Sequence, residues 1–298
     1  MKKNTINHTN PIAPSELIIT NEGRIYHLDL LPKDIADTII VVGDQERVPL
    51  VSQHFDSIDT KINKREFYTH TGTKNGKRIT VLSTGIGCDN IDIVINELDA
   101  LANIDFNTKL PKSEFKKLKI VRIGTSGALQ EDIPVDSSVI STYGLGFDGL
   151  LGFYNTNYEN DEIELQNEFK KQIKWPKEAN QPYFVKGSTD LLNKLGDGMF
   201  RGITATANGF YGPQGRSLRL AANVPNLNEY LNEFSYKDQR ITNFEMETSA
   251  LYGLSAMLGH EACTVCAIIA NRFQKAYSED YKKPVNELIS TTLERLTS

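Results

Sequence analysis

One pattern recurs along this chain and restricts its fold more than any other feature of the sequence. A short apolar, β-branched run leads into glycine and polar residues in 37–44 (DTIIVVGD), 77–87 (KRITVLSTGIG) and 118–129 (LKIVRIGTSGAL), and in the last two segments we expect a strand followed by a glycine loop. Helix-like stretches follow the first two runs, at 45–55 and 90–104. Strands that alternate with helices in this way indicate an α/β fold built on a sheet.

Later segments continue the alternation. Strands are expected within 137–145, 201–212 and 261–273, and a helix over 283–296 with Pro284 near its first turn. No low-complexity linker and no internal repeat divides the 298 residues. We therefore expect a single domain, 1–298.

Three polar parts of the chain are expected to lie outside the sheet. Residues 1–20 predict an extended N-terminal arm, and the polar stretches 104–118 and 154–182 predict surface excursions. The N-terminus has no long apolar core, and no apolar run approaches the roughly 18 residues of a membrane span. These features predict a cytoplasmic protein with no membrane partner.

The net charge argues against nucleic acid as a partner and indicates that any anion site is local. With 33 basic and 38 acidic side chains, the net charge is -5, which argues against a general nucleic-acid binder. Any bound anion must then be held by a local group of arginines. Cys263 and Cys266 lie in the apolar run ACTVCAIIA and have no second cysteine pair, so we expect core residues and no metal site.

The ends of the expected strands are the candidate ligand sites. In open α/β sheets ligands bind beyond the carboxyl ends of strands, and glycine there leaves N–H groups free for an anion. Arg47 follows the first glycine segment, and Arg122 lies inside the apolar strand KIVRIG. A buried arginine needs a counter-ion, which is either a protein carboxylate or a bound anion. The pattern leaves both open.

A second buried-charge problem lies in residues 241–260 (ITNFEMETSALYGLSAMLGH). An apolar strand changes into a helix there, and Glu245 and Glu247 flank Met246 at the junction. Carboxylates are seldom buried unless they are paired. We therefore expect each glutamate to have a partner nearby.

These segments together resemble a known family. VVGDQERV, STGIG, VRIGTSGAL, GFYGPQGR and NFEMETSALYGL, in this order, are similar to motifs of the nucleoside phosphorylase superfamily, and IIANRF resembles its uridine phosphorylase branch. The likeness runs from about Tyr26 to the C-terminus. It implies a central mixed sheet flanked by helices. It also implies a homo-oligomeric enzyme, dimer or hexamer, that converts nucleoside and orthophosphate into base and ribose 1-phosphate without another cofactor.

The resemblance also assigns roles to residues. It implies a phosphate site built from Gly43, Arg47, Arg122 and Thr125, with Arg65 contributed by a neighbouring subunit. It implies ribose contacts from Glu247, Met246, Glu245 and, across the subunit interface, His27. The base would meet Phe210, Gln214 and Arg216. Arg122, Thr125 and Glu247 would carry the catalytic step, in which phosphate stabilises and then attacks a positively charged ribose.

The late strand bears on which base is cleaved. Purine enzymes of this superfamily place an aspartate just after it, where this chain has Ala270 and Asn271. Uracil leaves without such an acid, which favours uridine. A purine nucleoside phosphorylase, a nucleosidase that uses water, and a non-catalytic nucleoside-binding protein remain alternatives. The nucleosidase is disfavoured because it has no use for Arg47, Arg65 and Arg122.

Overall fold

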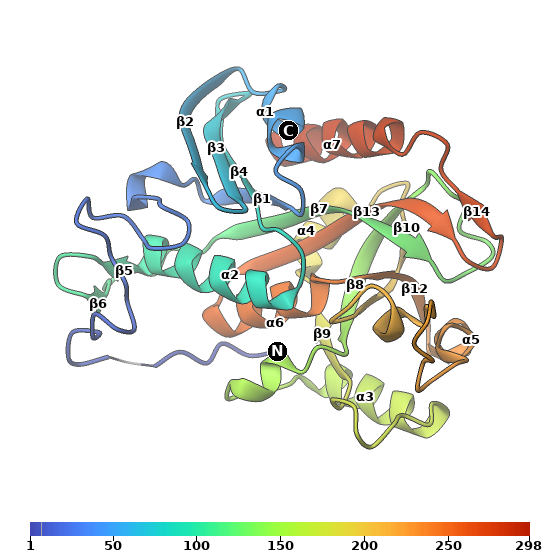
Figure 1. The fold of residues 1–298 in the computed structure, drawn as a ribbon. Coiled ribbons are helices and arrows are strands. Elements are labelled where there is room, and N and C mark those ends of the chain that lie inside the picture. Colours follow the sequence, from blue (N-terminus) through green and yellow to red (C-terminus); the bar gives the residue numbers. More distant parts are fainter. Residues whose placement is uncertain (7) are drawn as a thin grey trace.

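The computed structural model describes residues 1–6 and 8–298, and it confirms a mixed sheet flanked by helices (Figure 1). The main sheet is twelve-stranded in these residues, with the order β11-β12-β10-β8-β13-β7-β1-β4-β3-β2 and with β9 beside β8 and β14 beside β13. Its strands are β1 (Thr38–Val42), β2 (Ser57–Lys64), β3 (Phe67–Lys74), β4 (Lys77–Ser83), β7 (Lys119–Ala128), β8 (Ser138–Gly146), β9 (Tyr183–Lys186), β10 (Phe200–Thr206), β11 (Ser235–Tyr236), β12 (Gln239–Glu245), β13 (Glu261–Asn271) and β14 (Ala276–Tyr277).

Helices cover both faces of the sheet. They are α1 (Arg47–Ser52), α2 (Cys88–Asn103), α3 (Asn160–Gln172), α4 (Thr189–Leu195), α5 (Leu227–Glu233), α6 (Thr248–Leu258) and α7 (Lys282–Thr297). In Figure 1, α1 and α7 lie above the central strands, whereas α2 and α6 lie below them. The helices expected over 45–55, 90–104 and 283–296 are thereby confirmed.

Strand β1 shows why the sequence requires two covering layers. Its side chains alternate between two buried apolar clusters: Ile39 and Val41 pack with α2 and α6, whereas Ile40 and Val42 pack with α1, α4 and α7. Parallel strands buried on both faces read as continuous apolar runs, and the run TIIVV has this form. Strands β4, β1, β7 and β13 are mutually parallel neighbours.

The sheet also closes on itself beside the site. Strand β12 pairs with β10 along its length, and its last residues pair with the end of β7, Asn243 with Ala128 and Phe244 with Gly127. Because β10 joins β8, β8 joins β13 and β13 joins β7, these strands form a closed cycle. The carboxyl ends of β7 and β12 are therefore hydrogen-bonded to each other.

One sequence expectation was wrong in detail. Segment 118–129 was expected to be a strand followed by a glycine loop, but β7 continues through GTSG to Ala128. Gly124 pairs with Cys266 and Thr125 with Ala267 of β13. A parallel neighbour on the full length of the segment keeps it extended, and the local sequence does not reveal that neighbour. The glycine loop expected after β4 is confirmed, since Gly85 and Gly87 adopt φ values of 74° and 100°.

The excursions lie where they were expected. Residues 104–118 carry a separate two-stranded hairpin, β5 (Ile104–Asp105) and β6 (Leu110–Pro111), and 154–182 carry α3. Residues 1–6 and 8–20 contain no helix or strand, and the Asn4 N–H donates to the Met257 carbonyl of α6. The hairpin of β2 and β3 was not predicted, because β2 is a polar strand at the edge of the sheet.

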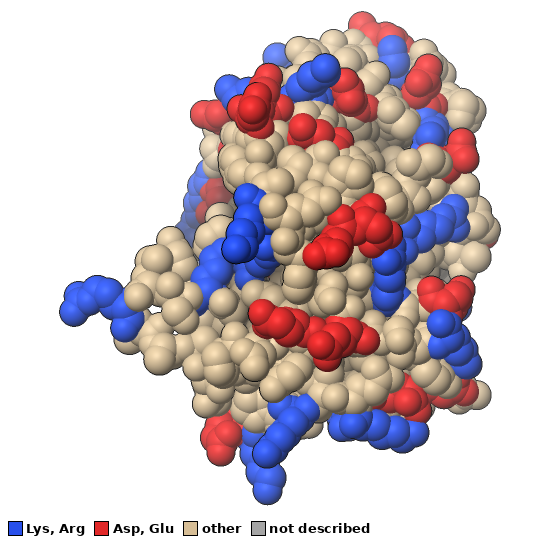
Figure 2. Space-filling view, turned by 90° about the vertical axis from the view of Figure 1, so that its right-hand side faces the viewer, with Lys and Arg blue, Asp and Glu red and all other residues tan. Residues whose placement is uncertain are grey.

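The surface carries both signs of charge. Figure 2 shows basic and acidic side chains interspersed over the face that it draws, with no large area of one sign there. Within the residues that the structure describes, no helix has the length and apolar character needed to cross a bilayer.

Candidate active site

The predicted site residues of the sheet lie after β1, within β7 and at the carboxyl end of β12. Gly43 follows β1, and a Cβ added to it would lie 3.6 Å from the carbonyl oxygen of Gly85, which follows β4. The two glycine segments are brought together because β1 and β4 are parallel neighbours. Helix α2 starts directly after the second segment, at Cys88.

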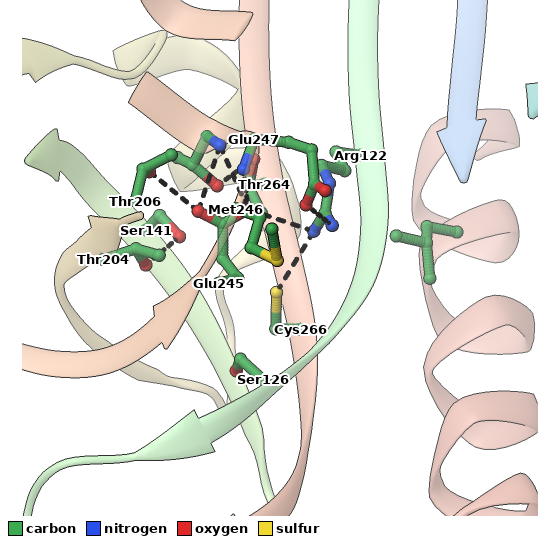
Figure 3. Close-up of polar contacts among 12 residues, drawn as sticks. Arg122, Ser126, Ser141, Thr204, Thr206, Glu245, Met246, Glu247, Thr264 and Cys266 are labelled. Carbon is green, nitrogen blue, oxygen red and sulfur yellow. Dashed lines mark hydrogen bonds and ion pairs between the residues drawn. The ribbon is translucent and has the colours of Figure 1, made fainter. Parts of the chain in front are cut away.

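Arg122 and Glu247 form the centre of this site (Figure 3). The Arg122 side chain comes from β7 and donates through Nη2 to the Glu247 carboxylate, and its Nη1 lies 3.4 Å from Glu245 Oε2. Arg122 is 5% exposed, and both glutamates are 4% exposed. Burial opposes the charge of Arg122, yet Glu247 and Glu245 raise its pKa above the ordinary value. Of the two counter-ions that the sequence left open for Arg122, the structure contains the protein carboxylate, on both Glu245 and Glu247.

The pairing leaves part of Arg122 unused. Its Nε is buried and has no hydrogen-bond partner among the described residues. A buried donor without a partner is costly, at about 1–3 kcal/mol. This atom is therefore a candidate contact for a bound acceptor.

Glu247 joins two parts of the fold. Its Oε1 accepts the N–H of Gly87 at 2.8 Å, just before α2, while Oε2 accepts from Arg122. The N-terminus of a helix carries partial positive charge, which stabilises a carboxylate there. Each oxygen retains acceptor capacity for a further donor, since an ionised carboxylate offers about four lone-pair sites.

Glu245 is held by protein donors on both oxygens. It accepts from Thr206 Oγ1 at 2.7 Å. It also accepts two backbone N–H groups at the start of α6, those of Glu247 at 2.9 Å and Thr248 at 3.0 Å. Burial raises the pKa of Glu245 to about 6, although Arg122 opposes the rise. These contacts suit a supporting residue that fixes the strand-to-helix junction.

Arg47 contacts β7 next to Arg122, and Thr125 lies on the same strand. Arg47 begins α1, and its Nη1 donates to the Ile123 carbonyl of β7 at 3.2 Å. Burial lowers the pKa of Arg47, and the charge of Arg122 lowers it further. Thr125 is partly exposed, three residues beyond Arg122 on the same strand. Met246 is half-buried between the glutamates, and its carbonyl accepts from the Cys88 thiol at 3.3 Å.

His27 and Arg65 lie together in a second group. The centroid of the Tyr26 ring is 4.8 Å from that of the His27 ring and 5.8 Å from the Arg65 guanidinium. His27 Nδ1 is hydrogen-bonded to Glu97 at 2.6 Å, and Arg65 is exposed at the turn between β2 and β3. The Arg65 carbonyl accepts from the Gln45 side chain in the Gly43 loop. Among residues 1–6 and 8–298, no hydrogen bond or ion pair joins either residue to Arg122 or Glu247.

The predicted base residues form a third group, which contains an arginine that the sequence reasoning missed. Arg216 Nη1 donates to the Gln214 Oε1 and to the Phe210 carbonyl, both at 2.6 Å, and its guanidinium lies 3.8 Å from the Phe210 ring centroid. Arg272 donates to the Gln214 carbonyl and lies 3.5 Å from its Oε1. Burial, reinforced by Arg216, lowers the pKa of Arg272 to about 10. Arg272 is part of the segment IIANRF, but the sequence analysis used that segment only as a resemblance to the uridine phosphorylase branch and gave Arg272 no role.

Asn271 has a structural use. Its Nδ2 donates to the carbonyls of Gln130 and Ile133, and its Oδ1 accepts the N–H groups of Phe273 and Gln274. The amide therefore shapes the turn after β13. No group of three His, Cys, Asp or Glu side chains within the described part of the chain is placed to hold a metal ion.

Comparison with known sequences gives a consistent result. The sequence model of the phosphorylase superfamily matches residues 37–296. A uridine phosphorylase of Thermococcus kodakarensis is 30% identical over 270 residues, which cover 89% of this chain and 83% of that protein. A purine nucleoside phosphorylase of Colwellia psychrerythraea is 25% identical over 271 residues, which cover 90% of this chain and 97% of the other.

Solved structures agree with the sequence matches. A nucleoside phosphorylase of Trypanosoma brucei, described as showing uridine phosphorylase activity, has a TM-score of 0.86 and 30% identity and covers 94% of this chain and 99% of its own. A structure from work on the uridine phosphorylases of Phytophthora capsici shares the fold, with a TM-score of 0.73 and 20% identity over 96% of this chain and 98% of its own. The resemblance drawn from the motifs is confirmed: the chain belongs to the phosphorylase superfamily and has the mixed α/β fold of nucleoside phosphorylases.

Proposed function

We propose that the protein catalyses reversible, phosphate-dependent cleavage of a pyrimidine nucleoside, most readily uridine, to give uracil and ribose 1-phosphate. Relatives named uridine phosphorylase support the reaction class. The observation that carries the proposal is the junction of Arg122 and Glu247, where a buried guanidinium contacts a carboxylate and keeps one donor unpaired. Such a pair can hold an anion on one side and ribose hydroxyls on the other.

Phosphate would bind among Gly43, Arg47, Arg122 and Thr125. Burial and the charge of Arg122 both lower the pKa of Arg47, and an anion beside the two arginines would offset this repulsion. Guanidinium groups match phosphate oxygens with two parallel hydrogen bonds. The unpaired Nε of Arg122 supplies a further donor.

Ribose would lie between this anion and Glu247. The free lone pairs of the Glu247 carboxylate accept hydrogen bonds from ribose hydroxyls, with Met246 beside them and Glu245 fixing the junction. As the C1′–N1 bond breaks, its electron pair passes to uracil and the ribose ring becomes cationic. A phosphate oxygen then forms the new bond to C1′, and the uracil anion takes a proton from solvent. Phosphate and Glu247 both stabilise the cation through preorganised charge.

Uracil would be read by Gln214, with Arg216 and Arg272 around it. An amide can accept from the uracil N3–H and donate to a ring carbonyl, and an arginine donates to the other carbonyl. The negative charge of the departing base is favoured beside two guanidinium groups. Asn271 is committed to backbone groups, so no side-chain acid at that position serves a purine N7.

His27 and Arg65 would act across a subunit interface. Both lie beside Tyr26 on the surface, away from hydrogen-bond contact with Arg122 and Glu247. In a homo-oligomer, each would reach a neighbour's ribose and phosphate. The active site would then be complete only between subunits.

The direct test is a panel of uridine, cytidine, inosine and adenosine at equal phosphate, with the released base measured by chromatography. We expect uridine to be cleaved only when phosphate is present, cytidine to be inert, and the purine nucleosides to be poor substrates. Faster cleavage of inosine would replace the pyrimidine assignment by a purine one. Cleavage without phosphate would identify a nucleosidase, and no cleavage of any nucleoside would favour a binding protein.

A further inference from the structure

The Arg122 side chain runs forward along its own strand and crosses Gly124. A Cβ added to Gly124 would lie 1.9 Å from Arg122 Nη1 and 2.8 Å from its Cζ. Real Cβ atoms do not approach other heavy atoms this closely. The guanidinium therefore occupies the space that any side chain at position 124 would fill.

Gly124 is not needed for backbone conformation. Its φ is outside the left-handed region, and it pairs in regular register with Cys266 of β13. Every amino acid can adopt an extended backbone of this kind. What glycine provides at this position is the absence of a side chain.

Cys266 forms the other side of the same space. Its Sγ would be 3.1 Å from a Cβ at position 124, and it accepts a hydrogen bond from Arg122 Nη1 at 3.7 Å (Figure 3). Cys266 is fully buried. Burial raises the pKa of this thiol to about 11, although Arg122 opposes the rise. The sulfur therefore stays neutral and does not compete with Glu245 and Glu247 for the arginine.

We propose that Gly124 and Cys266 are positioning residues that form a slot for Arg122 and direct its guanidinium to Glu247 and the phosphate. The proposal rests on the function proposed above, because it concerns the geometry of that phosphate site. The slot is defined by Gly124 below the guanidinium and the Cys266 sulfur beside it. Neither residue touches the reacting atoms.

The slot predicts a functional defect that is larger than the folding defect. The atoms that an added methyl group would meet first are at the far end of the long, flexible Arg122 side chain, not in the backbone. Gly124→Ala should therefore displace the guanidinium and leave β7 intact. Losing charged hydrogen bonds worth about 1.5–3 kcal/mol corresponds to roughly 10- to 150-fold in a binding constant.

The test is a double-mutant cycle on the binding of inorganic phosphate, measured by calorimetry with Gly124→Ala, Arg122→Ala and the double variant. We expect each single variant to raise the dissociation constant by about 10-fold or more. We expect Gly124→Ala to change it by less than about twofold in the Arg122→Ala background, because the methyl group then has nothing to displace. Gly152→Ala is the control, since a Cβ there meets no atom within 4 Å and should leave binding unchanged.

The outcomes separate this inference from the proposed function. If Arg122→Ala binds phosphate normally, the phosphate site itself is wrong. If Arg122→Ala is defective but Gly124→Ala is normal, or if the two effects add in the double variant, the slot is wrong. Cys266→Ser, a small acceptor, should retain binding better than Cys266→Val, and equal binding by the two would remove Cys266 from the slot. Circular dichroism and thermal unfolding show whether each variant is folded.

Discussion

Replacing Glu247 by glutamine tests the centre of the site, because glutamine keeps the shape of the side chain and removes its charge. Glu247 accepts from the Gly87 N–H on one oxygen and from Arg122 on the other. In glutamine one of these oxygens becomes an NH2 group, which must face a donor. At least one donor then loses its partner.

The size of the effect follows from these contacts. Breaking a buried ion pair by removing one partner costs about 3–5 kcal/mol. Glu245 lies 3.4 Å from Arg122 and still compensates its charge, so we expect a smaller loss than this range, about 2–3 kcal/mol of unfolding free energy. The free energy of unfolding of a typical domain is about 5–15 kcal/mol, so the variant should still fold. Turnover should fall roughly 10- to 150-fold, because the amide cannot offset the ribosyl cation.

Two measurements on one preparation separate a catalytic from a structural role of Glu247. Urea unfolding gives the stability, and the change in ultraviolet absorbance of uridine with saturating phosphate gives the turnover. Glu261→Gln is a matched control, since Glu261 pairs with the exposed Lys117 at 3.2 Å and such pairs contribute less than about 1 kcal/mol. A folded Glu247→Gln protein with turnover within twofold of the parent would remove Glu247 from the mechanism. A loss of activity equal to the loss of folded protein would assign it a structural role only.

Three further predictions use other parts of the site. Mixing Arg65→Ala and Arg122→Ala chains should restore part of the activity through hybrid sites, and no recovery after verified subunit exchange would contradict shared sites. Arg272→Ala should raise the KM for uridine about 10-fold or more through lost charged hydrogen bonds to Gln214, with the KM for phosphate unchanged; equal changes in both would contradict a base-reading role. Because the pKa of Glu245 is raised to about 6, the native protein takes up this proton before the unfolded chain does as the pH falls. The unfolding free energy of the parent relative to Glu245→Gln should therefore increase from pH 7 to pH 4.5, and a flat difference in urea unfolding would refute the raised pKa.

The sequence predicted that the buried charges have partners, and the structure confirms this pairing. An arginine in an apolar strand and two glutamates at a strand-to-helix junction required partners, and the structure pairs Arg122 with both Glu245 and Glu247. This could be anticipated because the cost of a buried charge depends on residue type and on local apolar context. The identity of the partners could not be read from the pattern, since 123 positions separate Arg122 from Glu245.

The errors have a common physical origin. A loop was expected at GTSG because glycine is frequent in turns, but pairing with β13 keeps this segment extended. Glycine is present at position 124 because the Arg122 guanidinium fills the space that a side chain would need. Arg272 was missed because its partner Gln214 is 58 residues away. The β2 strand was missed because an edge strand needs no apolar face. Each feature depends on a neighbour that is distant in sequence.

The pairing of the carboxyl ends of β7 and β12 constrains the proposed catalytic residues more tightly than the proposed base-binding residues. Arg122 belongs to one of these strands, and the glutamates belong to the other and its extension. Backbone hydrogen bonds therefore set the spacing between the cation and the carboxylates, whereas Gln214 and Arg216 lie on a connection between β10 and α5 that the sheet does not constrain. Sequence can change in that connection without moving the reacting groups. Enzymes named for purine and for pyrimidine nucleosides both align with most of this chain, as expected if base choice changes in this connection and in the turn after β13 while the paired strands stay the same.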